Sequence, residues 1–350
     1  MKGLVKYALG MDGVGLQDLP DPVLKEGECK VKVLAASICG SDIHAMRDER
    51  SVTMPVVMGH EYVGQIVETR GDTGELKVGD WVTTLPACYS CGECEMCRAG
   101  VVTLCRERKS IGSHRNGAMA NFVVVPAKYT YKIPDNACTR EQKISYALAE
   151  PFACVVRGVY ERLDVKEGDT VVVSGPGVMG QMASILFKSR GAYVILSGLP
   201  ADADKLALAK ELGSVDETVT SVEELKAAVC RRNPYGADIT CDCTGVTPSL
   251  DTCMQVIRPM GFHLQLGMFG GKVPFRLDSF FDREVTYVPS NSSSVSAWKI
   301  TMELLEKGVS LEPFVTLQLP LEQWKEAFDA VLEKKVYKAV LLPDNTFEEV

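Results

Sequence analysis

The pattern of apolar positions changes character near Glu150. Before it, apolar residues form short runs broken by Gly and Pro, and three runs at 30–36, 62–68 and 81–84 are rich in residues that favour strands. After it, apolar runs alternate with segments whose apolar residues recur at helical spacing. We therefore expect an irregular β-rich part followed by an α/β part.

The segment from Asp169 to Gly267 predicts a series of βαβ units. The run 170–174 is nearly all β-branched, as expected for a strand buried on both faces. Ser221 followed by Glu224 forms a capping box at the start of one helix. Such alternation builds a doubly wound parallel sheet. Further strands are expected at 192–197, 217–220, 238–243 and 261–267, helices at 178–190, 204–213 and 221–232, and, from residue 296, two amphipathic helices and a last strand at 338–342.

Length and charge limit the function. The chain has 350 residues, enough for two domains, and its net charge of -8 offers no footprint for nucleic acid. No apolar run is long enough to cross a bilayer, and the start lacks the apolar region of a signal peptide. With 13 cysteines in such a chain, we expect a reducing, cytoplasmic location with no membrane partner.

Four cysteines in one short loop predict a structural metal site. They follow the spacing C-x2-C-x2-C-x7-C, which can wrap a tetrahedral zinc with no open position. An iron–sulfur cluster is the alternative metal, whereas a disulfide framework is disfavoured in a chain this long. The four residues are Cys91, Cys94, Cys97 and Cys105.

A glycine motif follows the first strand of the α/β part. Gly175, Gly177 and Gly180 form G-x-G-x-x-G, with Val178 and Met179 inside it, at the start of a helix. Glycines there allow a tight turn and let a pyrophosphate approach the helix N-terminus. In this strand–turn–helix setting the motif predicts a dinucleotide site.

The sequence at the end of the second expected strand, 192–197, does not distinguish NAD from NADP. This strand ends at Ser197 and Gly198, where a carboxylate for the ribose diol is expected. Asp202, Asp204 and Lys205 follow slightly later, in what resembles a short insertion. The choice between NAD and NADP therefore stays open.

A second metal site is a hypothesis from three separate motifs. Cys39 follows a predicted strand, His60 lies in a Gly-His-Glu triplet, and Glu150 stands at the junction before Pro151. One thiolate, one imidazole and a carboxylate leave room for a substrate on zinc, as catalytic sites do. Spacing alone does not link these residues, since each also fits a structural role.

Together these motifs resemble the zinc-containing medium-chain dehydrogenase/reductase family over essentially the whole chain. Glu150 before Pro151 is most similar to the polyol branch, with sorbitol, galactitol-phosphate and threonine dehydrogenases. The resemblance implies a GroES-like β-rich catalytic domain at 1–149 and 290–350, and a Rossmann cofactor domain at 150–289. Its motifs are Cys39-Gly-Ser-Asp-x-His44, Gly59-His-Glu-x-x-Gly64, the four-cysteine loop, Gly117 with the strand 122–126, Glu150-Pro151 and the glycine motif.

The resemblance also implies the roles of the residues. Cys39, His60 and Glu150 would bind the catalytic zinc, with Glu61 as an alternate ligand or a neighbour of the ligands. Ser41 and His44 would relay the alcohol proton toward solvent. The residues expected to contact the cofactor outside the glycine motif are Ser197, Gly198, Thr244, Gly267, Met268 and Phe269.

The expected activity is hydride transfer between a secondary alcohol of a polyol or related compound and NAD or NADP, with two zinc ions per chain. The alternatives are oxidation of a β-hydroxy amino acid, as in threonine dehydrogenases, and a dinucleotide-binding sensor without catalysis. A homodimer or homotetramer is expected from the family.

The remaining polar residues are expected to be structural. His114 and His263 belong to no motif, and Cys88 is a spare cysteine beside the zinc loop. We expect the other cysteines to act as small buried apolar residues. These are Cys29, Cys138, Cys154, Cys230, Cys241, Cys243 and Cys253.

Overall fold

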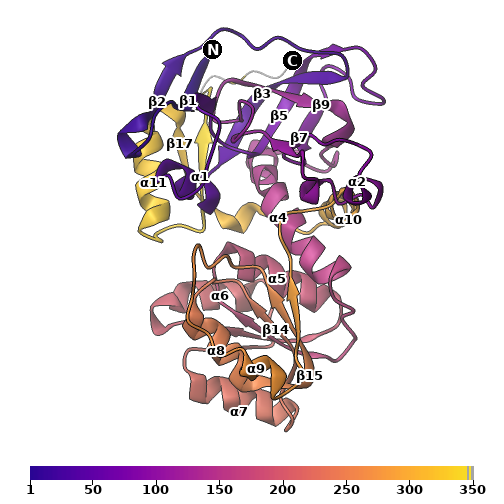
Figure 1. Ribbon diagram of the computed structural model, residues 1–350, viewed down its shortest axis with the longest axis vertical. Coiled ribbons are helices and arrows are strands. Elements are labelled where there is room, and N and C mark those ends of the chain that lie inside the picture. Colours follow the sequence, from indigo (N-terminus) through magenta and orange to yellow (C-terminus); the bar gives the residue numbers. More distant parts are fainter. Residues whose placement is uncertain (345–346, 348–350) are drawn as a thin grey trace. The chain divides into compact units, whose positions relative to one another are not determined.

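The computed structural model describes residues 1–344 and residue 347, and its contacts divide the chain into two units (Figure 1). One unit holds Met1–Ala153 together with the tail from Ser293, and the other is Cys154–Ser292. Positions 345–346 and 348–350 of the expected β-rich domain lie outside the described residues.

The first unit is built on a large mixed sheet. Its centre is the antiparallel pair of β3 (Glu28–Ser37) and β5 (Glu61–Arg70), whose inward side chains include the fully buried Tyr62 and Ile66. The other strands of this sheet are β6 (Trp81–Thr84), β9 (Phe122–Pro126), β10 (Thr130–Lys132), β17 (Val315–Pro320) and β18 (Lys338–Leu342). A small sheet of β1 (Lys2–Lys6), β2 (Val14–Asp18) and β4 (Val56–Val57) accompanies it.

The tail of the chain returns to the first unit. β18 pairs antiparallel with β3, with Val340 opposite Ser37, and runs parallel to β17. The two expected tail helices are α10 (Val295–Glu306) and α11 (Trp324–Leu332), but β17 between them was not predicted from the sequence. Residues 315–319 alternate apolar and polar side chains, which is a strand pattern, so the signal for β17 was present in the sequence.

The second unit is a parallel sheet, described throughout 154–292. Its strand order is β13-β12-β11-β14-β15-β16, and every neighbouring pair is parallel. The order reverses between β11 and β14, which is the switch point where doubly wound sheets bind ligands. The strands are β11 (Thr170–Ser174), β12 (Tyr193–Ser197), β13 (Glu217–Val219), β14 (Ala237–Asp242), β15 (Ile257–Gln265) and β16 (Thr286–Pro289).

Three helices of this unit begin within one residue of the positions predicted from the sequence. Ser221 caps α7 (Val222–Arg232), since its side chain accepts a hydrogen bond from the Glu224 amide. Leu225 and Val229 of α7 then pack on Val172 and Ile195 of the sheet. The other main helices are α5 (Val178–Ser189), α6 (Ala203–Glu211) and α8 (Thr247–Val256), with α8 labelled beside β14 in Figure 1.

One expectation about the cysteines is wrong. Cys138 and Cys230 are exposed, and Cys154 and Cys243 are half-buried, whereas Cys29, Cys241 and Cys253 are buried as expected. Cys230 lies on the solvent side of α7, so a preference for burial does not outweigh the helix register. Among the described residues, no helix combines the length and apolar character needed to span a bilayer.

Candidate metal and dinucleotide sites

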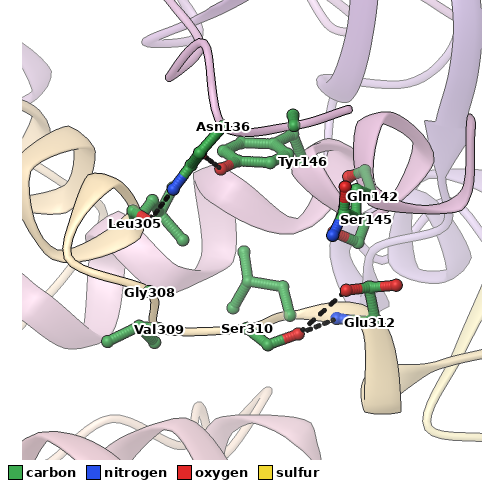
Figure 2. Close-up of a pocket in the computed structure, with 11 residues that line it drawn as sticks. Asn136, Gln142, Ser145, Tyr146, Leu305, Gly308, Val309, Ser310 and Glu312 are labelled. Atoms are coloured by element: carbon green, nitrogen blue, oxygen red, sulfur yellow. Dashed lines mark hydrogen bonds between the residues drawn. The ribbon is translucent and has the colours of Figure 1, made fainter. Parts of the chain in front are cut away.

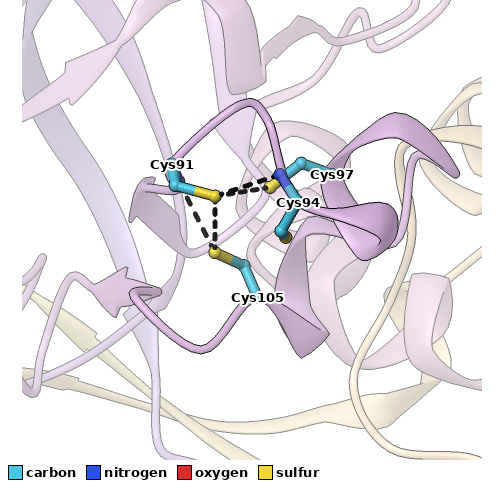
Figure 3. A group of neighbouring side chains, drawn as sticks. All are labelled: Cys91, Cys94, Cys97 and Cys105. Carbon is cyan, nitrogen blue, oxygen red and sulfur yellow. Dashed lines mark hydrogen bonds between the residues drawn. The ribbon is translucent and has the colours of Figure 1, made fainter.

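The four cysteines of the loop converge on one point (Figure 3). All four sulfur atoms lie within 4.8 Å of one another, and Cys91 Sγ is 3.8 Å from Cys97 Sγ and 3.6 Å from Cys105 Sγ. A tetrahedron of thiolates around zinc has edges of about 3.8 Å, because each Zn–S bond is about 2.3 Å. The spacing therefore fits a zinc ion held by four thiolates.

The backbone around this cluster favours thiolates. The Cys91 amide donates to Cys105 Sγ, and the Cys94 amide donates to Cys91 Sγ. The first of these hydrogen bonds is the main reason why the pKa of Cys105 is lowered to about 7. A metal needs the deprotonated sulfur, so Cys105 is prepared for metal binding near neutral pH, whereas the pKa of Cys94 is raised to about 11 and its proton would have to leave when a metal binds.

The loop is anchored to the tail of the same unit. Thr103 donates its hydroxyl to the Ser293 carbonyl at 2.8 Å, and the Val295 amide donates to the Gly100 carbonyl at 3.1 Å. The short helix α2 (Glu95–Arg98) carries Cys97, while Cys94 caps it. Because the loop has few apolar side chains of its own, these bonds and a bound metal would hold its shape.

A second cluster joins Cys39, His60 and Glu61, with one atom of each within 4.8 Å of the others. Cys39 caps α1 (Gly40–Met46), His60 directly precedes β5, and Glu61 is the first residue of β5. Gly59 has φ of 89°, and a Cβ placed there would lie 2.6 Å from Met119 Cγ. The chain turns tightly at Gly59, and this turn brings His60 toward Cys39.

Asp42 supports this cluster, a role that was not predicted from the sequence. Its carboxylate accepts a hydrogen bond from the Cys39 amide at 2.9 Å and lies 3.6 Å from His60 Nδ1. Burial would lower the pKa of His60, but the charges of Asp42 and Cys39 hold it well above its usual value. A carboxylate that orients a ligand imidazole is a common feature of zinc sites. The signal was present, since Asp42 lies inside the Cys39–His44 motif.

The carboxylates of this region are not equivalent. Glu61 is fully buried and accepts from Lys338 Nζ at 2.6 and 2.8 Å, while Glu150 is buried but outside the group of three. Burial lowers the pKa of Lys338, but the charges of Glu61, Cys39 and then Glu150 outweigh it and raise this pKa. The structure thus groups Glu61, and not Glu150, with Cys39 and His60.

The two expected relay residues differ in their surroundings. Ser41 is buried, and among the described residues its hydroxyl has no hydrogen-bond partner. His44 is about one-third exposed, and its Nδ1 lies 2.5 Å from Glu49 Oε2. The Ser41 hydroxyl is therefore available both to donate and to accept a hydrogen bond, and the His44 ring reaches toward solvent.

The glycine motif leaves room where a phosphate is expected. A Cβ on Gly180 would lie 1.9 Å from the Gly175 carbonyl oxygen, so the helix must approach the turn closely there. A Cβ on Gly177, which caps α5, would meet nothing within 4 Å. Val178 and Met179 are half-buried at the first turn of α5. This arrangement exposes a helix N-terminus that suits a pyrophosphate.

An acidic and a basic side chain, Asp202 and Lys205, lie close to the end of β12. A Cβ on Gly198 would lie 3.4 Å from Asp202 Cβ, so Asp202 comes close to the missing acidic position. Asp202 accepts from the Leu199 amide at 3.0 Å and pairs with Lys205 at 3.1 Å. Ser197, half-buried at the strand end, accepts from the Gly175 amide.

The loops after β14 and β15 lie against each other. A Cβ on Gly267 would lie 2.2 Å from the Gly245 amide, and Thr244 packs on Gly175. Met268 is exposed, and Phe269 packs beside Leu250. The structure thus brings Thr244, Gly267 and Met268 to the glycine motif's side of the sheet.

The first unit also has a cavity of about 90 Å³, which is lined by none of the candidate metal ligands or glycine-motif residues (Figure 2). Tyr146 donates to Asn136 Oδ1, and Asn136 in turn donates to the carbonyls of Leu305 and Glu306. These bonds tie its walls together, and the volume is far below the several hundred Å³ of ordinary ligand pockets.

Comparison with known proteins finds relatives that cover almost the whole chain. Residues 25–135 match the alcohol dehydrogenase GroES-like domain, and residues 178–307 match the zinc-binding dehydrogenase domain. D-arabitol-phosphate dehydrogenase of Enterococcus avium is 37% identical over 97% of both chains. Sorbitol dehydrogenase of Halalkalibacterium halodurans is 32% identical, covering 98% of this chain and 99% of its own.

A solved structure has the same fold. A zinc-binding dehydrogenase of Sinorhizobium meliloti, bound to NADP, superposes with a TM-score of 0.85 and 28% identity, covering 98% of this chain and 99% of that one.

Proposed function

Because the chain belongs to the zinc-containing medium-chain dehydrogenase/reductase family, we propose that it oxidises a secondary alcohol of a polyol or polyol phosphate. It is an NAD(P)-dependent oxidoreductase that acts on a small-molecule alcohol. The relatives named for arabitol phosphate and sorbitol support this substrate class. The single structural observation that carries the proposal is the cluster of unlike ligands at Cys39, His60 and Glu61.

The two metal clusters would have different tasks. Cys91, Cys94, Cys97 and Cys105 would hold a closed structural zinc, whereas Cys39 and His60 with Glu61 or Glu150 would hold a catalytic one. When bound, the catalytic zinc supplies a Lewis acid that lowers the pKa of an alcohol, and the dinucleotide accepts the hydride. A cluster of three ligands leaves a position for that alcohol.

The residues around Cys39, His60 and Glu61 would transfer the alcohol proton and orient the zinc ligands. Ser41 would accept the alcohol proton on its unpartnered hydroxyl oxygen, and His44 would pass it to solvent. Asp42 would orient His60. Gly175, Gly177 and Gly180 would admit the pyrophosphate of NAD or NADP, with Val178 and Met179 in the same turn.

We also propose the domain division expected from the sequence, with a catalytic domain at 1–149 and 290–350 and a cofactor domain at 150–289. Ser197, Gly198, Thr244, Gly267, Met268 and Phe269 would then contact the cofactor.

A homodimer or homotetramer is part of the proposal. β16 pairs with β15 alone among the described strands, so one side of it is an edge. Phe262 and Tyr287 on these two strands are each about 40% exposed, and Phe281 is 81% exposed. An apolar edge strand of this kind favours pairing with a second copy. A cytoplasmic location is proposed because none of the 13 cysteines is in a disulfide.

Metal content and cofactor reduction test the proposed function together. Zinc per chain is measured alongside NAD and NADP reduction with D-arabitol phosphate, sorbitol and L-threonine. Two zinc ions and turnover of a polyol or its phosphate are expected. Turnover of threonine alone would favour the β-hydroxy amino acid alternative, and full zinc loading without turnover of any alcohol would favour the sensor.

A further inference from the structure

Asp242 is a buried carboxylate surrounded by neutral donors. It ends β14 with no exposed surface, and the salt bridges of the described residues do not include it. A buried charge is costly unless hydrogen bonds satisfy it. Its oxygens accept five: from the Thr244 amide at 2.8 Å, the Thr244 hydroxyl at 2.7 Å, Ser249 Oγ at 2.7 Å, the Gly245 amide at 3.3 Å and Gln265 Nε2 at 2.7 Å.

These donors connect Asp242 to the glycine motif. Ser249 lies 2.8 Å from Ser174 Oγ, and Ser174 is the last residue of β11 before Gly175. A Cβ on Gly175 would lie 2.4 Å from Thr244 Cγ2. The carboxylate therefore holds Thr244 directly against the turn that is proposed to admit the pyrophosphate.

Asp242 also holds the loop that follows β15. Its carbonyl oxygen accepts from the amides of Leu266 and Gly267 at 3.0 and 2.9 Å, and Gln265 Nε2 donates to the Gly267 carbonyl as well. Gly245 has φ of 69°, and a Cβ there would lie 2.2 Å from the Met268 carbonyl oxygen. The two loops are therefore in backbone contact. The first is tied to the carboxylate of Asp242, and the second to its main-chain carbonyl and, through Gln265, to its carboxylate.

The position of this network in the sheet gives it a function. β11 and β14 are neighbours at the switch point, and Asp242 stands at the carboxyl end of β14. Ligands of doubly wound sheets bind beyond the carboxyl ends of the strands at this point. The loops after β11, β14 and β15 meet there around Asp242.

We propose that Asp242 is a positioning residue that sets the loops at Thr244–Gly245 and Gly267–Met268 for the nicotinamide end of the cofactor. This inference rests on the proposed function, because it assumes a nicotinamide dinucleotide. A carboxylate accepts hydrogen bonds at both oxygens, as Asp242 does here. An asparagine would turn an amide N–H toward either Gln265 and Gly245 or toward Thr244 and Ser249, so one loop would lose its acceptor.

The test compares two ligands on Asp242→Asn in the zinc-loaded protein. The dissociation constant is measured for whichever of NADH or NADPH the wild type binds, and for the matching ADP-ribose fragment, which lacks nicotinamide. We expect the affinity for the reduced cofactor to fall about tenfold, the scale of one lost hydrogen bond to a charged group. The affinity for the fragment should change less than about twofold, because none of the side-chain hydrogen bonds of Asp242 is made to a residue of the glycine motif itself.

Asp238→Asn is the matched control. Asp238 lies at the other end of β14, where it pairs with Arg258 and accepts from the Thr170 amide. This variant should lose some stability but change neither affinity. If Asp242→Asn does not fold, Ser249→Ala removes one donor of the network, and the same selective loss is expected at a smaller size.

The outcomes separate the two proposals. An equal loss for both ligands, or no loss for either, would overturn the role of Asp242. A wild-type protein that binds neither dinucleotide would instead contradict the proposed function.

Discussion

The ammonium of Lys338 lies 2.6 Å from Oε2 of Glu61, although 277 positions separate the two residues. Both side chains are buried, and Lys338 also donates to the Ile38 carbonyl, next to Cys39. The tail strand β18 therefore supplies the cation that neutralises a carboxylate beside the candidate metal ligands.

Lys338→Met should destabilise the zinc-free protein, because it removes the cation that is paired with the buried carboxylate of Glu61. The expected loss in the free energy of unfolding is about 3–5 kcal/mol. Urea unfolding would measure it. The double variant Lys338→Met with Glu61→Gln should recover part of the loss, and a double variant that is less stable than the single one would contradict this account of the pair.

Cys39→Ala should remove one zinc ion and leave the other. Activity should fall by at least about 10³-fold, because a Lewis acid supplies several kcal/mol to such a reaction. Zinc per chain, melting temperature and turnover are measured together. Loss of both metals, or an unfolded protein, would mean that the two clusters are not independent.

Cys97→Ser should act on stability more than on chemistry, because metal binding by this loop contributes to folding. The free energy of unfolding should drop by more than the roughly 0.5 kcal/mol typical of surface substitutions. Cys138→Ser, at an exposed thiol outside the cluster, is the control. Equal melting temperatures for the two variants would argue against a structural metal.

Two glycines of one motif should respond differently to alanine. Gly180→Ala should destabilise the second unit by about 1–3 kcal/mol, since its Cβ would collide with the Gly175 carbonyl. Gly177→Ala meets open space, so it should keep its melting temperature and weaken binding of NAD or NADP. Calorimetry measures the stability of both variants, and titration measures their affinity for the cofactor. An unchanged affinity in Gly177→Ala would mean that the pyrophosphate does not bind at this glycine.

His263 should make stability depend on pH. Burial lowers its pKa below the usual 6.5, and its ring nitrogens face Thr240 and Gln265. The unfolded chain therefore binds the proton first, so this contribution is full above pH 6.5 and is lost as pH falls through the lowered pKa. Urea midpoints between about pH 5 and 8 should show a steeper decline in the wild type than in His263→Gln. If the urea midpoints of the two proteins change with pH in the same way, groups other than His263 cause the pH dependence.

The parallel sheet and the four-cysteine cluster follow from local sequence. Val171, Val172 and Val173 predict a strand buried on both faces, and the ligands from Cys91 to Cys105 lie within one loop. In each case the residues that cooperate are near in the chain, so spacing carries the information. The exposed Cys230 shows the limit, because helix register and not residue type decides its burial.

The sequence by itself determined the kind of chemistry available: thiolate and imidazole ligands, a glycine turn at a helix N-terminus, and a chain long enough for two cores. Only the tertiary structure decided which groups meet. It placed Glu61, and not Glu150, with Cys39 and His60, brought Lys338 to Glu61, and tied three loops to Asp242. The physical reason is that strand pairing and buried ion pairs join residues that are far apart in the chain. For such residues, the spacing along the sequence does not predict their distance in space.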